Sequence, residues 1–162
     1  MPWTGQPIRM ADGKLMIESY DRVDVFTGVD VGKSEHYAVA LDRSGKRLYD
    51  KVLPNDEARL RAVIEKLMRR GQVLLVVDQP ETVGALPAAV AYAEGILVGY
   101  LPGVAMRRIA DLHAGEAKTD ARDAAIIAEA ARTLPHALRP IRLEDEQVAE
   151  LSMSPRTRWN PS

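Results

Sequence analysis

The chain has no cysteine among its 162 residues. This absence excludes a disulfide framework, a thiolate zinc site and a cysteine nucleophile. It is typical of proteins of the reducing cytoplasm, where we expect this one to be found. The three histidines (His36, His113 and His136) lie far apart and lack the spacing of zinc ligands.

The chain also has no excess of positive charge. The 22 basic and 23 acidic residues leave a net charge of −1, whereas nucleic-acid-binding domains are usually basic. Aromatic residues are few, with one Phe, two Trp and five Tyr, and show no pattern typical of single-strand binding. The stretch 83–106 has no Lys or Arg but contains Glu94, prolines and glycines, so we expect no membrane partner.

What the chain does have is the composition of one globular domain. Hydrophobic residues make up 46% and charged residues 28% of it. Apolar β-branched runs predict strands, and apolar spacing of three and four predicts helices. The predicted strands are 23–29, 36–41, 46–53, 73–77 and 96–100. The predicted helices are one capped by Asn55 and ended by Gly71, then 82–93, 104–111, 119–132 and a piece near 148–153.

The order of these elements predicts the fold class. Turn residues at 42–45 join two strands into a hairpin, and strands and helices alternate after it. This order predicts a three-layer α/β fold, with a mixed central sheet flanked by helices. We expect a flexible leader at 1–20, one domain at 21–153 and a tail at 154–162.

Acidic residues stand at three positions where a site could form. Asp30 ends the first strand, Asp78 directly follows the run 73–77, and Asp120 and Asp123 lie three residues apart at a helix start. Ligands gather at the carboxyl ends of strands in α/β sheets, and a spacing of three puts two side chains on one helix face. Each position also has an ordinary structural interpretation, as a turn or as helix capping.

Taken together, these acids suggest a metal site. Four carboxylates in one place repel each other unless divalent cations neutralise them. Oxygen ligands without His or Cys favour Mg²⁺ or Mn²⁺. Two such ions, about 3.5–4 Å apart, promote in-line displacement at phosphorus, so the hypothesis is phosphodiester chemistry.

The segments 28–37, 77–80 and 118–124 resemble the DEDD-type insertion-sequence transposases, relatives of the Piv DNA invertase. The resemblance implies an N-terminal RuvC-like domain with a ribonuclease H fold. It also implies that four aspartates form the acidic tetrad that holds the metal ions: Asp30, Asp78, Asp120 and Asp123. The second position of the tetrad is usually Glu in the family, and here it is Asp78.

The resemblance further implies DNA as substrate and, for several members, a structured guide RNA. We expect phosphate contacts from Lys33, Arg107, Arg108, Lys118 and Arg122. Family members are longer and carry a C-terminal domain with a serine thought to be the nucleophile. We therefore expect a truncated transposase or recombinase that cannot complete strand transfer alone.

Two other interpretations remain open. One is a non-catalytic remnant that binds nucleic acid or dimerises. The other is an actin-like ATPase domain, whose first strand also ends in a Gly-x-Asp-x-Gly turn but which needs a second lobe. For the full-length protein we expect a homo-oligomer.

Overall fold

The computed structural model describes residues 8–9, 15–16, 20–78, 86–102 and 119–140. The predicted helices at 104–111 and near 148–153 lie outside these residues, as does the tail. Within the predicted leader, two short strands pair with each other: β1 (Ile8–Arg9) and β2 (Leu15–Met16). The short 3-10 helix η1 (Tyr20–Arg22) follows them.

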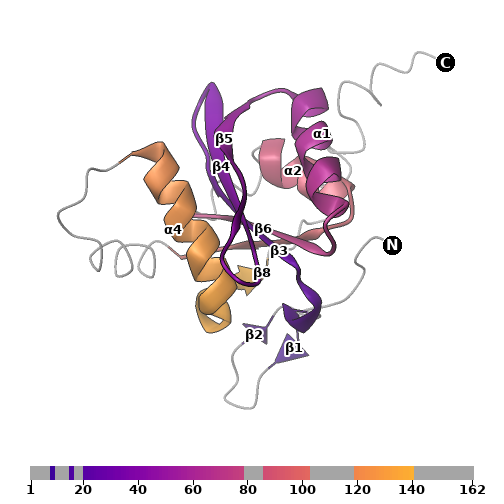
Figure 1. Cartoon of the computed structure of the whole chain (residues 1–162), viewed down its shortest axis with the longest axis vertical. Coiled ribbons are helices and arrows are strands. Elements are labelled where there is room, and N and C mark those ends of the chain that lie inside the picture. The colour runs from indigo at the N-terminus through magenta and orange to yellow at the C-terminus, as the bar shows by residue number, and fades with distance from the viewer. Residues whose placement is uncertain (1–7, 10–14, 17–19, 79–85, 103–118, 141–162) are drawn as a thin grey trace.

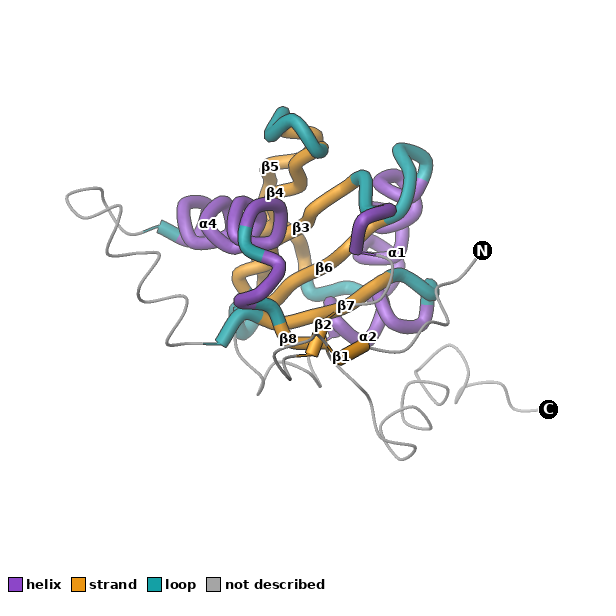
Figure 2. The backbone as a smooth tube through the Cα atoms, turned by 90° about the horizontal axis from the view of Figure 1, so that it is seen from below, coloured by secondary structure: helices purple, strands orange, loops and turns teal. Residues whose placement is uncertain are grey.

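A six-stranded sheet forms the centre of the domain (Figures 1 and 2). Its strands are β3 (Val25–Asp30), β4 (Glu35–Asp42), β5 (Arg47–Pro54), β6 (Val73–Val77), β7 (Leu97–Tyr100) and β8 (Arg139–Pro140). They lie in the order β5-β4-β3-β6-β7-β8. The pairs β3–β6 and β6–β7 are parallel and the other three are antiparallel, which confirms the predicted mixed sheet.

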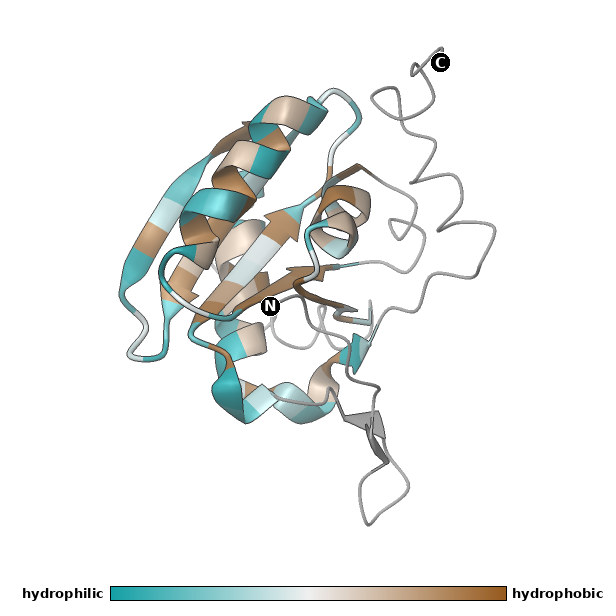
Figure 3. Cartoon of the chain, turned by 90° about the vertical axis from the view of Figure 1, so that its right-hand side faces the viewer, coloured by the Kyte–Doolittle hydropathy of each residue, from teal (hydrophilic) through white to brown (hydrophobic). Residues whose placement is uncertain are grey.

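The helices cover the two faces of this sheet. Helices α1 (Glu57–Met68) and α2 (Leu86–Ala93) pack on one face, and α4 (Asp120–Thr133) packs on the other. Figure 3 shows the middle of the sheet mostly apolar, with hydrophilic residues on the outer side of the helices. The predicted three-layer arrangement is therefore confirmed.

Alternation along the strands decides which side chains meet which helix, because neighbouring residues point to opposite faces. On β3, Val25 and Val29 join the cluster beneath α1 and α2, whereas Phe26 packs with Ile127 of α4. On β6, Leu75 and Val77 face α1 and α2, whereas Leu74 and Val76 face α4.

The start of α1 differs from the prediction. The N-cap is Asp56, whose carboxylate accepts a hydrogen bond from the Arg59 amide at 2.9 Å. Asn55, the predicted cap, lies one residue too early and instead pairs its Oδ1 with Nε2 of His36 at 2.9 Å. Both residue types cap helices well, so the sequence alone did not separate them. The helix ends at Met68, three residues before Gly71.

Candidate acidic site

The carboxyl ends of β3 and β6 lie side by side at one edge of the sheet. The two strands are parallel, and their register pairs Val29 with Val77. Asp30 and Asp78 follow these residues. Each lies two positions after a residue that faces α4 (Gly28 and Val76), so alternation puts both carboxylates on the α4 side.

Helix α4 brings the other two aspartates to this edge. It begins at Asp120, and its N-cap is Thr119, whose hydroxyl accepts from the Arg122 amide at 3.0 Å. The helix runs from this edge toward the opposite end of β3, where the Tyr20 hydroxyl donates to the Ala131 carbonyl. Because Thr119 supplies the cap, neither Asp120 nor Asp123 is needed for it.

The four aspartates interact through Asp30. Burial raises the pKa of Asp30 from its ordinary value of 3.8 to about 7, helped by a hydrogen bond with the Asp120 carboxyl and by the charges of Asp78, Asp120 and Asp123. The carboxyl groups of Asp30 and Asp120 are therefore in contact. Asp78, Asp120 and Asp123 therefore each lie close enough to Asp30 to influence its charge.

The chemistry of this donor set suits a hard divalent cation, since every donor is a carboxylate oxygen. In the structure, the Asp30 and Asp120 carboxyls contact each other, with the charges of Asp78 and Asp123 nearby. Within the described residues, no group of three or more His, Cys, Asp or Glu side chains is arranged as a ready-made metal site.

The predicted nucleic-acid contacts are described only in part. Lys33 is exposed in the turn between β3 and β4, on the same edge as Asp30. Arg122 is half-buried in the first turn of α4. Arg107, Arg108 and Lys118 lie outside the described residues.

Three residues near the site were missed by the sequence analysis. Gly28 lies under the backbone of α4, His36 holds the turn after Asp30, and Tyr37 is the cross-strand partner of Asp30. None of the three had a local signal in the sequence, because each role depends on how the strands and helices pack.

In the part of the chain that the structure describes, no helix is long and apolar enough to span a membrane.

Comparison with known proteins gives the ancestry of the chain. The sequence profile of the DEDD transposases of IS110 type matches residues 27–160. An uncharacterized 43.6 kDa protein of insertion element IS110 from Streptomyces coelicolor is 59% identical over 132 residues, which are 81% of this chain and 33% of that protein. An uncharacterized 42 kDa protein of IS900 from Mycobacterium paratuberculosis is 38% identical over 130 residues, 78% of this chain and 32% of that protein.

A solved structure supports the fold. Thermus thermophilus RuvC, solved in complex with a Holliday junction substrate, superposes with a TM-score of 0.52 at 16% identity and covers 73% of this chain and 99% of its own. At this identity the likeness shows the RuvC-like, ribonuclease H-like fold alone. The chain spans about a third of the length of its curated relatives. The chain belongs to the DEDD transposase family of IS110-type insertion elements.

Proposed function

We propose that this chain is the metal-dependent catalytic domain of a DNA transposase, with Asp30, Asp78, Asp120 and Asp123 as the ligands of Mg²⁺ or Mn²⁺. The observation that carries the proposal is the contact between Asp30 and Asp120, beside the charges of Asp78 and Asp123. Aspartates that served only as turns and caps would have no reason to meet at one edge of the sheet. Like charges gathered in this way are costly without a cation.

In this proposal the protein's own groups supply position and charge. Asp30 ends β3, Asp78 directly follows β6, and Asp120 and Asp123 lie in the first turn of a helix, so rigid elements position all four carboxylates. Cations held by these carboxylates would supply an activated nucleophile and charge stabilisation at a phosphodiester.

The family supports DNA as the substrate, and the RuvC neighbour was solved with a DNA junction. A guide RNA, a homo-oligomer, strand transfer and a cytoplasmic location are further proposals from the family resemblance. The requirement for a serine-bearing C-terminal domain also stays a prediction, as does the division into a leader, one domain and a tail.

A thermal-shift titration with Mn²⁺ and Mg²⁺ tests the site. The wild type should melt at temperatures that rise with the logarithm of metal concentration, because the ion binds only the folded chain. Asp30→Asn and Asp120→Asn should lose this response. Without metal, Asp30→Asn should be no less stable than the wild type, because burial and the neighbouring carboxylates disfavour a charged Asp30.

A matched control separates the site from general charge effects. Glu65→Gln removes one negative charge from an exposed position on α1, and it should keep the full metal response. If all four proteins respond alike, the ions bind elsewhere and the proposal is wrong. A wild type without any response would favour the non-catalytic remnant, in agreement with the lack of three converged ligands among the described residues.

A further inference from the structure

A short apolar strip lies beside the acidic edge, on the same face of the sheet. Asp30 on β3 pairs directly with Tyr37 on β4, and Tyr37 pairs directly with Val52 on β5. Residues directly opposite each other on antiparallel strands have side chains on the same face, with Cβ atoms about 4.5–5.5 Å apart. A row therefore runs from Asp30 across Tyr37 to Val52. We call Tyr37 and Val52 the Tyr37–Val52 strip.

The strip lies on the α4 face, beside that helix. Tyr37 packs against the cluster formed by Val39, Leu41 and Ala124, which fixes one side of its ring at the start of α4. Helix α4 packs mainly on β3 and β4. Tyr37 itself is half-buried, and Val52, one strand further from α4, is 46% exposed. Apolar surface is thus open to solvent next to the carboxylates.

Hydrogen bonds hold the tyrosine ring in place. The Tyr37 hydroxyl donates to Asp50 Oδ1, and Arg47 binds the other oxygen of the same carboxylate. The polar end of Tyr37 is therefore tied toward β5, away from Asp30. The ion pair also neutralises Asp50, so the strip has no net charge of its own.

Charge along this edge fits one kind of occupant. Carboxylates accept a phosphate only through cations, whereas an uncharged aromatic surface beside them suits the flat base of the neighbouring nucleotide. Lys33, in the turn joining β3 and β4, adds a positive charge for the next phosphate at the same edge. The acidic, aromatic and basic groups at this edge together match the phosphates and bases of a nucleotide strand.

We propose that the Tyr37–Val52 strip binds an unpaired nucleobase next to the phosphodiester held at the acidic edge, with the base stacked on the Tyr37 ring. This inference rests on the proposed function, because the carboxylate site defines where the phosphodiester lies. Tyr37 is a substrate-binding residue that takes no part in proton transfer.

Two substitutions at one position separate stacking from hydrogen bonding. Tyr37→Leu removes the aromatic face but keeps an apolar side chain against Val39 and Ala124. Tyr37→Phe keeps the ring and removes the bond to Asp50. Tyr49→Leu is the matched control, because Tyr49 is a half-buried tyrosine on β5 that packs on the opposite face of the sheet.

The measurement is fluorescence anisotropy of a labelled ten-nucleotide oligothymidylate, compared with an abasic oligonucleotide of the same length, both in Ca²⁺. Tyr37→Leu should weaken binding of oligothymidylate about 5- to 150-fold, the range expected for one stacked base. Tyr37→Phe and Tyr49→Leu should stay within about twofold of wild type. The abasic oligonucleotide should bind wild type and Tyr37→Leu equally.

The inference is overturned if Tyr37→Leu binds oligothymidylate as tightly as the wild type, or if it loses the abasic oligonucleotide to the same extent. A wild type that binds neither oligonucleotide overturns it as well. Mn²⁺ thermal shifts of the same proteins keep the two proposals apart. A missing metal response in the wild type contradicts the carboxylate site, whereas a normal response with unchanged oligonucleotide binding contradicts only the strip.

Discussion

Gly28 lies against the backbone of α4 at Ala124. A Cβ added at Gly28 would come within 2.4 Å of the Ala124 carbonyl oxygen and of the Ala128 amide nitrogen. Both atoms belong to the helix backbone, so no side chain can move aside to make room. The absence of a side chain at position 28 therefore sets how closely α4, with Asp120 and Asp123, approaches Asp30.

The first prediction concerns this contact. Gly28→Ala should push α4 away from β3, destabilise the fold by about 1–3 kcal/mol and weaken the Mn²⁺ response. Urea unfolding and thermal shift measure the two effects. Ala40→Gly, on the neighbouring strand and the opposite face, is the control. Ala40→Gly should lower the free energy of unfolding by loosening a strand, yet keep the metal response. Equal metal responses in the two variants would contradict the spacing role of Gly28.

The second prediction concerns His36, which is 4% exposed and holds the turn after Asp30. Its Nδ1 accepts from the Gly32 amide at 3.1 Å, so its Nε2 carries the proton that it donates to Asn55 Oδ1. His36→Asn keeps an acceptor near Nδ1, and His36→Gln keeps a donor near Nε2. Amide hydrogen exchange at Gly32 should stay slow in the Asn variant and become faster in the Gln variant.

Loss of the Gly32 bond should also make the Gln variant about 1 kcal/mol less stable than the Asn variant. The opposite order, in exchange or in stability, would show that the Asn55 contact matters more for the turn than the bond to Gly32.

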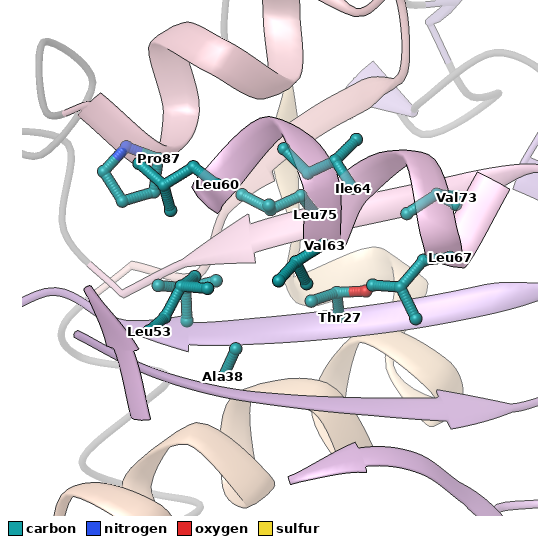
Figure 4. A pocket seen from close by; sticks show the side chains of 11 residues that line it. Thr27, Ala38, Leu53, Leu60, Val63, Ile64, Leu67, Val73, Leu75 and Pro87 are labelled. Atoms are coloured by element: carbon teal, nitrogen blue, oxygen red, sulfur yellow. The ribbon is translucent and has the colours of Figure 1, made fainter. Parts of the chain in front are cut away.

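The third prediction concerns Thr27, a polar residue buried in the core at 2% exposure. Among the described residues, its hydroxyl oxygen has no hydrogen-bond partner. It lines a cavity of about 10 Å³ whose other lining residues, including Leu53, Leu67 and Leu75, are apolar (Figure 4). Thr27→Val keeps the shape and removes the unpaired hydroxyl.

Thr27→Val should therefore stabilise the chain by about 1 kcal/mol or more in urea unfolding. Thr27→Ala should destabilise it, because the enlarged cavity outweighs the loss of the hydroxyl. A destabilised Val variant would show that the hydroxyl finds a partner in solution.

The fourth prediction concerns pH. Burial raises the pKa of Tyr20 from 10.0 to about 12, and its hydroxyl donates to the carbonyls of Ala131 and Arg132 at the end of α4. The folded chain holds this proton more tightly than the unfolded chain. The stabilisation is therefore complete below pH 10 and is lost as the pH rises toward 12.

Urea midpoints of the wild type and Tyr20→Phe check this prediction. The wild type should be the more stable protein at pH 8, and the difference should shrink between pH 10 and 12. Tyr37 and Tyr49 also have raised pKa values, but both proteins contain them, so their effects cancel in the comparison. A constant difference across this range would contradict the role of the Tyr20 hydroxyl.

The sequence predicted the elements with strong local patterns. The apolar run 73–77 became β6 with the same bounds, and the turn at 42–45 became the hairpin, where Asp42 accepts from the amides of Ser44 and Lys46. Strand-end acids and parallel pairing were enough to expect Asp30 and Asp78 at one edge. The alanine-rich segment at 119–132 became α4 with a shift of one residue.

Features that depend on tertiary contact could not be predicted in this way. Strand β8 has only two residues and forms because β7 offers it a partner. The role of Gly28 depends on a helix that comes about a hundred residues later, and a glycine in a strand can equally mark a bulge or a bend. The bond between His36 and Asn55 likewise joins two residues that no local pattern connects.

The parallel pairing of β3 with β6 also has a consequence for synthesis on the ribosome. Strands β3, β4 and β5 are neighbours in both sequence and sheet, so they can pair while later residues are still being added. Strand β6 and helix α4 arrive afterwards, and α4 carries half of the aspartates. A nascent chain therefore presents Asp30 long before its partners exist. Any reaction at this edge has to wait until translation has passed α4.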